Sequence, residues 1–167
     1  QTWNYFCTFT YDSAKHTEES FRKKLSDTFK KMCYRRGWKY IGVWERSVEK
    51  ERLHFHGLFY IPDGQMIGDL VEVQDYSVKT EKVQKTVQNT YFNERFGRSD
   101  FEAIQSVYSL DSSIRYILKY IEKCGARIVY SRNLPQYFVS DIMDDDVLCT
   151  IGQEDRKLLL FDSFTCW

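Results

Sequence analysis

Hydrophobic and polar residues alternate in three segments of the N-terminal part of the chain. Alternation places successive side chains on opposite faces of a strand, so it predicts strands at residues 3–11, 38–47 and 52–61. The link between the second and third strands is short, which favours an antiparallel hairpin with the two strands side by side. In the first strand the pattern separates two sets of side chains: Tyr5, Cys7, Phe9 and Tyr11 on one face, and Phe6, Thr8 and Thr10 on the other.

Apolar residues recur at helical spacing in three further segments. The first helix is predicted from about residue 18, with Thr17 as its N-cap and Gly37 as its end. A second is predicted at residues 83–96, where apolar positions are sparse. A third is predicted at residues 112–123. Short strands are predicted around these helices, at residues 70–73, 101–107 and 127–131, and again after Pro135.

The order of these elements predicts the fold class. Helices and strands are mixed and at least one hairpin is expected, which indicates an α+β fold with a mainly antiparallel sheet and flanking helices. No repeat and no Gly/Ser-rich linker interrupts the sequence. We therefore predict a single domain over residues 1–167, with an acidic C-terminal segment at residues 136–167.

Composition and cysteine content narrow the possible environments. Apolar residues make up 43% of the chain and aromatic residues 17%, which excludes a disordered or collagen-like protein. No apolar run approaches the roughly 18 residues of a membrane span, and residues 1–11 are strand-like rather than a signal peptide. The five cysteines are odd in number and form no CxxC pair, which argues for reduced thiols in the cytoplasm and against a zinc knuckle.

Charge is distributed unevenly although the net charge is zero. Residues 1–135 carry 22 Lys and Arg against 17 Asp and Glu, whereas residues 136–167 carry 2 against 7. A basic body with an acidic tail can present a local phosphate-binding face that the total conceals. This pattern permits nucleic-acid binding without requiring it.

A pair of histidines on the strand at 52–61 is the first candidate for chemistry. His54 and His56 are two residues apart, so a strand sends both imidazoles to the face opposite Leu53, Phe55 and Phe59. Two imidazoles on one face can bind a divalent ion. Glu45 lies on the preceding strand, and in the predicted hairpin its carboxylate reaches the histidines. Nitrogen and oxygen ligands together suit Mg²⁺ or Mn²⁺ at a phosphate oxygen. The alternative is a pair of surface histidines without a role.

The helix at 112–123 is the second candidate. At about 100° per residue, Tyr116, Lys119, Tyr120 and Lys123 form one stripe and Ile114, Ile117, Leu118 and Ile121 the opposite one. The apolar stripe can anchor the helix to the core, which leaves the phenols and ammonium groups displayed together. A neighbouring cation or metal favours the ionised, nucleophilic phenol. The alternative is that the tyrosines lie beside lysines on a solvated face.

Three segments of the chain resemble, in order, the motifs of the HUH endonucleases, the Rep proteins that initiate rolling-circle replication. They are the aromatic and threonine-rich residues 5–12 (YFCTFTYD), the histidine segment 53–58 (LHFHGL) and the doubled YxxK of residues 116–123 (YILKYIEK). The third is the most specific and is similar to initiators of small single-stranded DNA phages of the microvirus type. Relatives with one tyrosine carry a single YxxK.

The resemblance implies a structure and a reaction. The fold would be a ferredoxin-like or RRM-like domain with a central five-stranded, mainly antiparallel sheet. Glu45 would take the place of the third metal ligand, beside His54 and His56. Tyr116 would attack single-stranded DNA at a replication origin, leaving a 5′-phosphotyrosine and a free 3′-OH, and Tyr120 would be the second nucleophile. Lys119 and Lys123 would contact phosphate or tune the phenols. The host would be a bacterium, with the protein in its cytoplasm.

Three other functions fit parts of the sequence. A transposase or plasmid relaxase of the HUH class would use the same chemistry on different DNA, although the doubled YxxK favours replication. A non-catalytic RRM-like module would stack single-stranded nucleic acid on aromatic residues such as Tyr5, Tyr11, Phe55 and Phe59. A closed structural zinc site would need four Cys or His ligands, and the sequence offers no such set. The sequence does not predict the oligomeric state.

Overall fold

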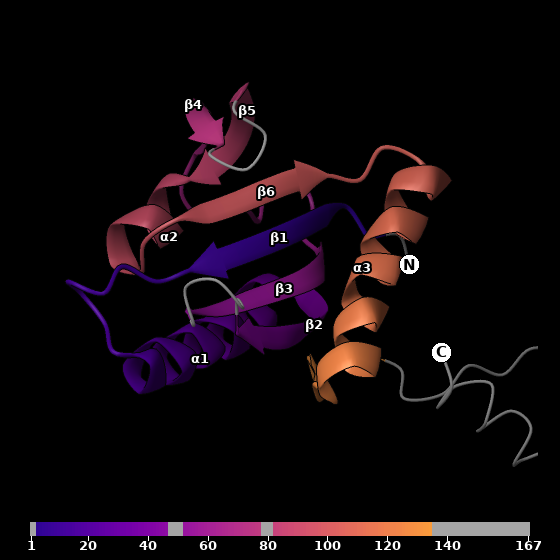
Figure 1. Cartoon of the computed structure of the whole chain (residues 1–167). Helices are drawn as coiled ribbons and strands as arrows, with labels where there is room; N and C mark the ends of the chain where they lie inside the picture. The colour runs from indigo at the N-terminus through magenta and orange to yellow at the C-terminus, as the bar shows by residue number, and fades with distance from the viewer. Residues whose placement is uncertain (1–2, 47–51, 78–81, 135–167) are drawn as a thin grey trace, which may run out of the picture. The chain divides into compact units, whose positions relative to one another are not determined.

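The computed structural model describes residues 3–46, 52–77 and 82–134 (Figure 1). Residues 47–51, the predicted hairpin link, and residues 135–167, with the acidic segment and its predicted strands, lie outside the described residues. The elements in chain order are β1 (Tyr5–Thr10), α1 (Glu18–Arg36), β2 (Lys39–Arg46), β3 (Leu53–Tyr60), β4 (Leu70–Ser77), β5 (Lys82–Asn89), α2 (Thr90–Arg95), β6 (Ser99–Ala103), α3 (Val107–Cys124) and β7 (Ile128–Tyr130).

The described part is an α+β domain built on a five-stranded sheet, which confirms the predicted fold class. The strand order is β6-β1-β3-β2-β7, and every neighbouring pair is antiparallel. The predicted pairing of β2 with β3 is confirmed, with Glu45 directly opposite His54. The strands β1 and β3 lie at the centre of the sheet, so the side chains of Thr8 and His56 are neighbours although they are far apart in the sequence.

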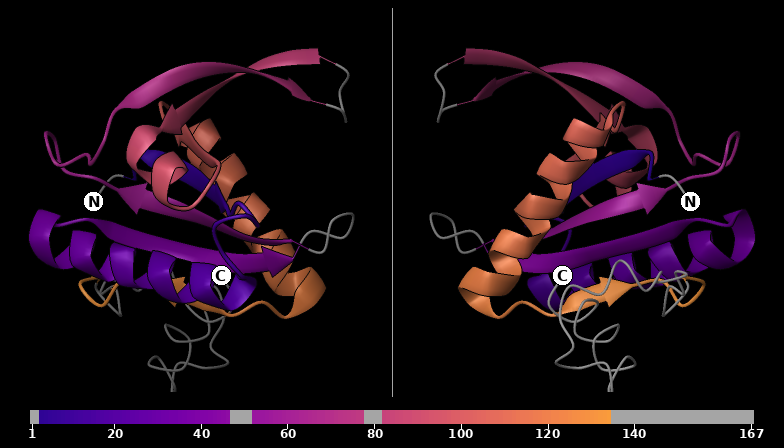
Figure 2. Two further views of the ribbon diagram at one scale, coloured as in Figure 1. Left: turned by 90° about the vertical axis from the view of Figure 1, so that its left-hand side faces the viewer. Right: turned by 90° about the vertical axis from the view of Figure 1, so that its right-hand side faces the viewer.

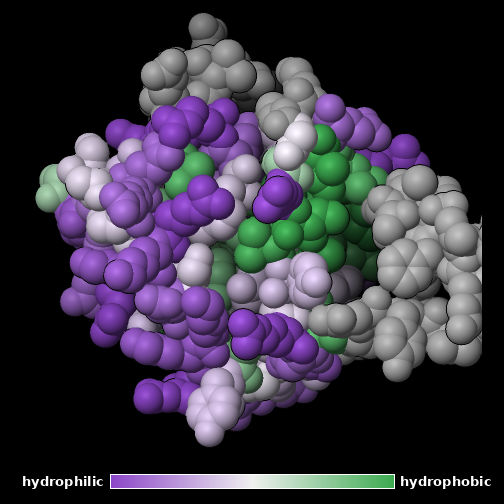
Figure 3. Space-filling model, turned by 90° about the horizontal axis from the view of Figure 1, so that it is seen from below, coloured by the Kyte–Doolittle hydropathy of each residue, from purple (hydrophilic) through white to green (hydrophobic). Residues whose placement is uncertain are grey.

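One face of the sheet is covered by α1, which runs beneath the strands in Figure 1. Thr17 forms a capping box with Ser20 at the start of the helix, and Gly37 takes the left-handed conformation at its end (φ 67°). The buried face of α1 packs its aromatic and aliphatic side chains against the rings of β1 and β3. Seen from below, the surface on this side is mostly hydrophilic, with one hydrophobic area (Figure 3).

The opposite face of the sheet carries α3, which crosses the strands at one end (Figures 1 and 2). Its buried contacts are fewer: Val43, Leu58 and Ile117 form the core of this side. The strand faces follow the predicted alternation, because Cys7 and Phe9 are buried beneath α1 while Thr8 and Thr10 contact the histidines on the other face. The helices thus leave part of the second face open beside α3.

Two predicted elements were wrong in part. Residues 82–89 are a strand rather than the first half of a helix, because β5 pairs with β4 along its whole length, from Ser77 opposite Lys82 to Leu70 opposite Asn89. The valines and threonine of β5 alternate with polar residues, which is a strand pattern. Only Thr90–Arg95 is helical, and the Asn89 side chain caps this helix by accepting from the Phe92 amide. The β4–β5 hairpin extends from the body of the domain (Figure 2).

The boundary between β6 and α3 also differs from the prediction. β6 ends at Ala103, and α3 begins at Val107 instead of residue 112. A capping box between Ser106 and Ser109 starts the helix. The pattern was missed because serine, rather than Glu or Gln, occupies the third helical position. The last residues of α3 reach the predicted end, with Gly125 in the left-handed conformation (φ 61°).

The chain divides into two compact units, residues 1–134 and 135–167. The structure describes only the first of them, so the predicted single domain over residues 1–167 stays a prediction. Within the described residues, no helix combines the length and the apolar character that a membrane crossing requires.

Candidate active site

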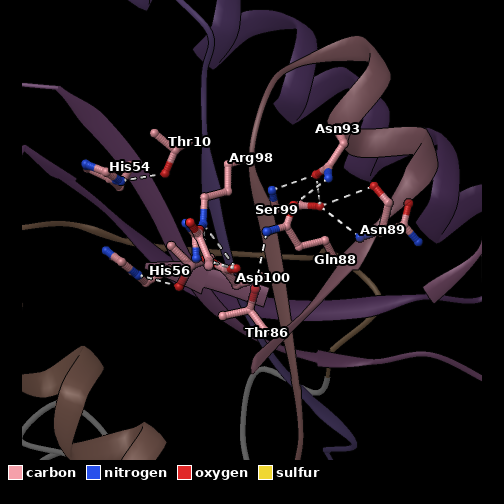
Figure 4. A network of polar contacts seen from close by, with 12 residues as sticks. Thr10, His54, His56, Thr86, Gln88, Asn89, Asn93, Arg98, Ser99 and Asp100 are labelled. Carbon is pink, nitrogen blue, oxygen red and sulfur yellow. Dashed lines mark hydrogen bonds and ion pairs between the residues drawn. The ribbon is translucent and has the colours of Figure 1, made fainter. Parts of the chain in front are cut away.

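The two histidines of β3 lie on the open face of the sheet, as predicted. Their rings are stacked, with centroids 5.9 Å apart. His56 is buried and His54 is half-buried. Each ring is held by the threonine directly opposite on β1: Thr10 Oγ1 lies 2.8 Å from His54 Nδ1, and Thr8 Oγ1 lies 3.0 Å from His56 Nδ1. Figure 4 shows the two rings side by side with these bonds. Because both Nδ1 atoms are occupied, Nε2 is the nitrogen left for a ligand on each ring.

Glu45 of β2 reaches the histidines, as the hairpin predicted. Its Oε2 lies 2.7 Å from His56 Nε2. Burial alone raises the pKa of this carboxyl, but the hydrogen bond and positive charge of His56 outweigh it, so the pKa is lowered and Glu45 is ionised at neutral pH. The carboxylate therefore accepts from the Nε2–H of His56.

The donor set suits a divalent ion, although these side chains do not form a closed cage. Among the described residues, no group of three His, Cys, Asp or Glu side chains is arranged around one ion position. Burial, followed by the neighbouring His56, lowers the pKa of His54, which favours the neutral imidazole that a metal needs as ligand. Two imidazoles and a carboxylate are ligands that Mn²⁺ and Mg²⁺ accept in part, with water or phosphate in the open positions.

The tyrosines of α3 face the sheet and contact the histidines. The Tyr116 ring meets the His56 ring edge-on at 5.2 Å, and the Tyr120 ring stacks on it at 5.7 Å. The predicted separation of tyrosines from the apolar anchor was therefore wrong in part. Because α3 begins five residues earlier than predicted, its buried stripe also contains a phenol, and Ile114 is 37% exposed instead of buried. The side chains of this stripe are Leu110, Ser113, Ile117, Tyr120 and Ile121.

The two phenols differ in their surroundings. The Tyr120 hydroxyl donates to the Tyr116 hydroxyl at 3.0 Å. Burial raises the pKa of Tyr116, and the bond from Tyr120 partly offsets this. Burial, the bond to Tyr116 and the nearby Glu45 carboxylate all raise the pKa of Tyr120. Since the donated bond stabilises a phenolate at Tyr116 and not at Tyr120, Tyr116 ionises first.

The two lysines of the doubled YxxK are less informative. Lys119 is exposed on α3. Lys123 lies in the last turn of α3, and its side chain is outside the described part of the structure. The predicted contacts of these lysines with phosphate stay a prediction.

An open cleft of about 680 Å³ joins the histidines to Tyr116 and to several polar side chains that sequence reasoning missed. Arg98 forms ion pairs with Asp100 on β6 and with Asp75 on β4, and the Arg52 guanidinium lies 5.8 Å from the centre of the Tyr11 ring. No motif singles out these arginines, because β6 and the hairpin reach the cleft only through the sheet order. The cleft is lined by Thr8, Thr10, Tyr11, Asp12, Arg52, His54, His56, Gly97, Arg98, Asp100 and Tyr116.

A buried polar network fixes the edge of this cleft (Figure 4). The Ser99 hydroxyl lies 2.6 Å from Asn93 Oδ1 and also accepts from the Asn89 amide. Asn93 in turn donates to Gln88 of β5 at 2.7 Å. These bonds join β5, α2 and the start of β6, and Arg98 is the residue immediately before Ser99. The position of Arg98 at the cleft is thus supported by satisfied buried groups.

The comparison with protein families identifies the chain. A family model for the replication-associated protein ORF2 matches residues 4–125, which contain all seven predicted site residues. The chain belongs to this replication-associated protein family. No curated protein and no solved structure matches it.

Members of the ORF2 family initiate rolling-circle replication, so the Rep resemblance seen in the sequence is confirmed. The chain is accordingly an enzyme of DNA replication, an endonuclease in general terms, and single-stranded DNA is its partner. The resemblance to the microvirus type in particular stays a prediction.

Proposed function

We propose that this replication-associated protein nicks and rejoins single-stranded DNA through a covalent 5′-phosphotyrosine, with Tyr116 as the first nucleophile. The observation that carries the proposal is the position of the Tyr116 hydroxyl. It accepts a hydrogen bond from Tyr120, its ring contacts His56, and it lines the open cleft together with both histidines. Nucleophile and predicted metal ligands thus meet at one place that DNA can enter.

His54, His56 and Glu45 would hold Mg²⁺ or Mn²⁺. When bound, such an ion polarises the scissile phosphate and stabilises the charge on its oxygens. Arg52 and Arg98 line the same cleft and bring positive charge to the DNA backbone. These residues place the phosphate beside Tyr116 and lower the energy of the charged transition state.

The protein side of the reaction is a transesterification. The Tyr116 oxygen attacks phosphorus, the bond from phosphorus to the 3′ oxygen breaks, and the DNA 5′ end stays on the enzyme. The phenol proton passes to water in the cleft, and the 3′ oxygen takes up a proton as it leaves. Tyr120 would act as the second nucleophile, and Lys119 and Lys123 would contact phosphate or tune the phenols.

Two alternatives keep some support. An HUH transposase or relaxase would share this geometry, and the match to the ORF2 family favours replication over either. A non-catalytic RRM-like module loses two of its predicted stacking platforms, because Phe55 and Phe59 are fully buried beneath α1. Its other two, Tyr5 and Tyr11, pack against the same core. We also propose the cytoplasm of a bacterial host as the location; among the described cysteines, Cys7 and Cys33 are free thiols.

The test is a covalent-adduct gel with single-stranded DNA of randomised sequence, in Mn²⁺ or in EDTA. Wild-type protein should give a band that survives denaturation and needs the metal. Tyr116→Phe should remove most of the adduct, and the double variant with Tyr120→Phe should remove it all. An adduct that persists in the double variant would contradict the proposal. If EDTA left DNA binding intact and no adduct formed, the binding-module alternative would be preferred.

A further inference from the structure

The two tyrosines open into different hollows. Tyr116 lines the 680 Å³ cleft with both histidines, and Tyr120 is not among its lining residues. Tyr120 instead lines a second hollow of about 390 Å³, together with Glu45. The hydroxyls of the two tyrosines are nevertheless only 3.0 Å apart. The phenol pair and the Glu45–His56 pair therefore stand between two separate spaces.

The second hollow has the charges of a phosphate site. Three arginines line it: Arg22 from α1, Arg46 from β2 and Arg127 from the segment after α3. Arg46 forms an ion pair with Glu18, which lines the hollow as well. Arg22 stacks over Trp44, with its guanidinium carbon 5.4 Å from the ring centre, an arrangement that leaves its N–H groups available around the rim of the plane. A guanidinium fork is suited to phosphate oxygens.

We propose that each tyrosine serves its own DNA segment: the first segment reaches Tyr116 through the histidine cleft, and a second segment reaches Tyr120 through the hollow lined by Arg22 and Arg127. This inference rests on the proposed function and adds to it a separate binding site for the second phosphodiester. Two strands that must exchange ends are thereby held at one reaction centre without sharing one path.

The chemistry of the exchange balances without a further reactant. The Tyr120 oxygen attacks the phosphorus of the second segment, and its bond to the 3′ oxygen breaks. The proton of the Tyr120 phenol passes through water to that 3′ oxygen. The new 3′-OH then attacks the phosphorus held by Tyr116, which forms a phosphodiester and returns the proton to the Tyr116 phenol. One bond between phosphorus and oxygen is made for each one broken.

The test compares the two tyrosines separately, using single-stranded DNA of randomised sequence and Mn²⁺. Tyr120→Phe protein reports the Tyr116 adduct, and Tyr116→Phe protein reports the Tyr120 adduct. Arg22→Gln with Arg127→Gln should lower the ratio of Tyr120 adduct to Tyr116 adduct about tenfold, the effect of losing one or two charged hydrogen bonds to phosphate. Arg52→Gln, in the first cleft, should raise the same ratio. Arg115→Gln is the matched control, because this α3 arginine pairs with Asp111 instead.

The outcomes separate the two proposals. A ratio that follows the crossed pattern supports separate paths. If the arginine variants lower both adducts equally, the tyrosines share one path and the inference is wrong. If wild-type protein forms no adduct at all, the proposed function fails first. Circular dichroism of each variant checks that the fold is kept.

A second inference concerns Thr8 and Thr10, which hold the histidine rings from β1. A neutral imidazole has one N–H donor and one acceptor nitrogen. In this structure the ionised Glu45 accepts from His56 Nε2–H, so His56 Nδ1 is the acceptor for the Thr8 hydroxyl at 3.0 Å. A metal ligand needs the reverse arrangement, with the proton on Nδ1 and the lone pair on Nε2.

A threonine hydroxyl satisfies both arrangements, because it can donate to Nδ1 or accept from it. A carboxylate or a carbonyl could only accept. We infer that Thr8 and Thr10 are positioning residues that keep each ring in place while its proton moves from one nitrogen to the other. The same geometry at both rings, 2.8 Å at His54 and 3.0 Å at His56, makes the pair a matched set.

Manganese affinity, measured by electron paramagnetic resonance of free Mn²⁺ without DNA, tests this inference. Thr8→Val should weaken binding about 10- to 100-fold, the usual effect of losing such an outer partner, and Thr8→Ser should restore it. Thr28→Val is the control, since this buried threonine bonds to the Lys24 carbonyl of α1.

Unchanged affinity in folded Thr8→Val protein would overturn the inference. If Thr8→Val does not fold, Thr10→Val decides in the same way. If wild-type protein binds no Mn²⁺, the proposed metal site itself is wrong, and the result does not depend on the threonines.

Discussion

The two faces of the sheet are built from the same strands but by different rules. The face beneath α1 is packed with rings: Phe9, Phe29, Phe55 and Phe59 are each at most 1% exposed. The face beside α3 has a core of three buried residues and places Thr8, Thr10, His54 and His56 where the other face has aromatic side chains. Alternation along β1 and β3 assigns every residue to one face or the other.

The difference shows how one strand carries both stability and chemistry. On β3, Phe55 lies between His54 and His56 in sequence and packs against Phe29 and Trp44 on the opposite face. Fixing the ring of Phe55 fixes the backbone between the two histidines. The packed face thus supplies the rigidity that a preorganised site needs, and the open face buries little apolar area on folding.

The largest effect is expected for Phe29→Ala on α1. The Phe29 ring lies within 5.2 Å of Phe9, Phe55 and Phe59, so its loss leaves a cavity at the centre of the packed face. We expect the free energy of unfolding to fall by about 3–5 kcal/mol, measured by urea titration. Tyr34→Ala on the same helix is the control, because Tyr34 is 91% exposed. A loss below about 1 kcal/mol would contradict the assignment of stability to this face.

An intermediate effect is expected for Gly42→Ala, which tests how closely the two faces are joined. Gly42 lies opposite Gly57 in the pair of β2 with β3. An added Cβ would lie 2.3 Å from the His56 carbonyl oxygen and 2.7 Å from the Phe55 ring. Backbone must move, and we expect a loss of about 1–3 kcal/mol in thermal or urea unfolding. Unchanged stability would mean that β2 and β3 can separate without cost.

The smallest effect on stability is expected for Tyr116→Phe. The ring is 37% exposed and keeps its contact with His56, while only the hydroxyl is removed. The free energy of unfolding should change by no more than about 0.5 kcal/mol, although the adduct is lost. The same urea titration measures it. A loss comparable to that of Phe29→Ala would make Tyr116 a packing residue and remove the contrast between the faces.

Sequence patterns predicted the site better than they predicted its surroundings. His54, His56 and Glu45 were expected together because a hairpin has few possible registers, and Glu45 does lie opposite His54. Arg98 could not be predicted to join them, since its place depends on β6 pairing with β1 and on the Asp75 ion pair across the hairpin. β5 was taken for a helix because its partner β4, not its own periodicity, decides its structure. The choice between the tyrosines needed the direction of their hydrogen bond.

The central position of β1 has a consequence for the order in which the molecule is made. The partners of Thr8 and Thr10 lie 48 and 44 residues further along the chain, and Tyr116 comes still later. Pairs so distant in sequence close only after a large loss of chain entropy, which makes such sheets slow to form. During synthesis, therefore, both histidines leave the ribosome well before the nucleophile does. An unfinished chain has no tyrosine helix and cannot cut DNA, so nicking activity begins only when α3 is complete.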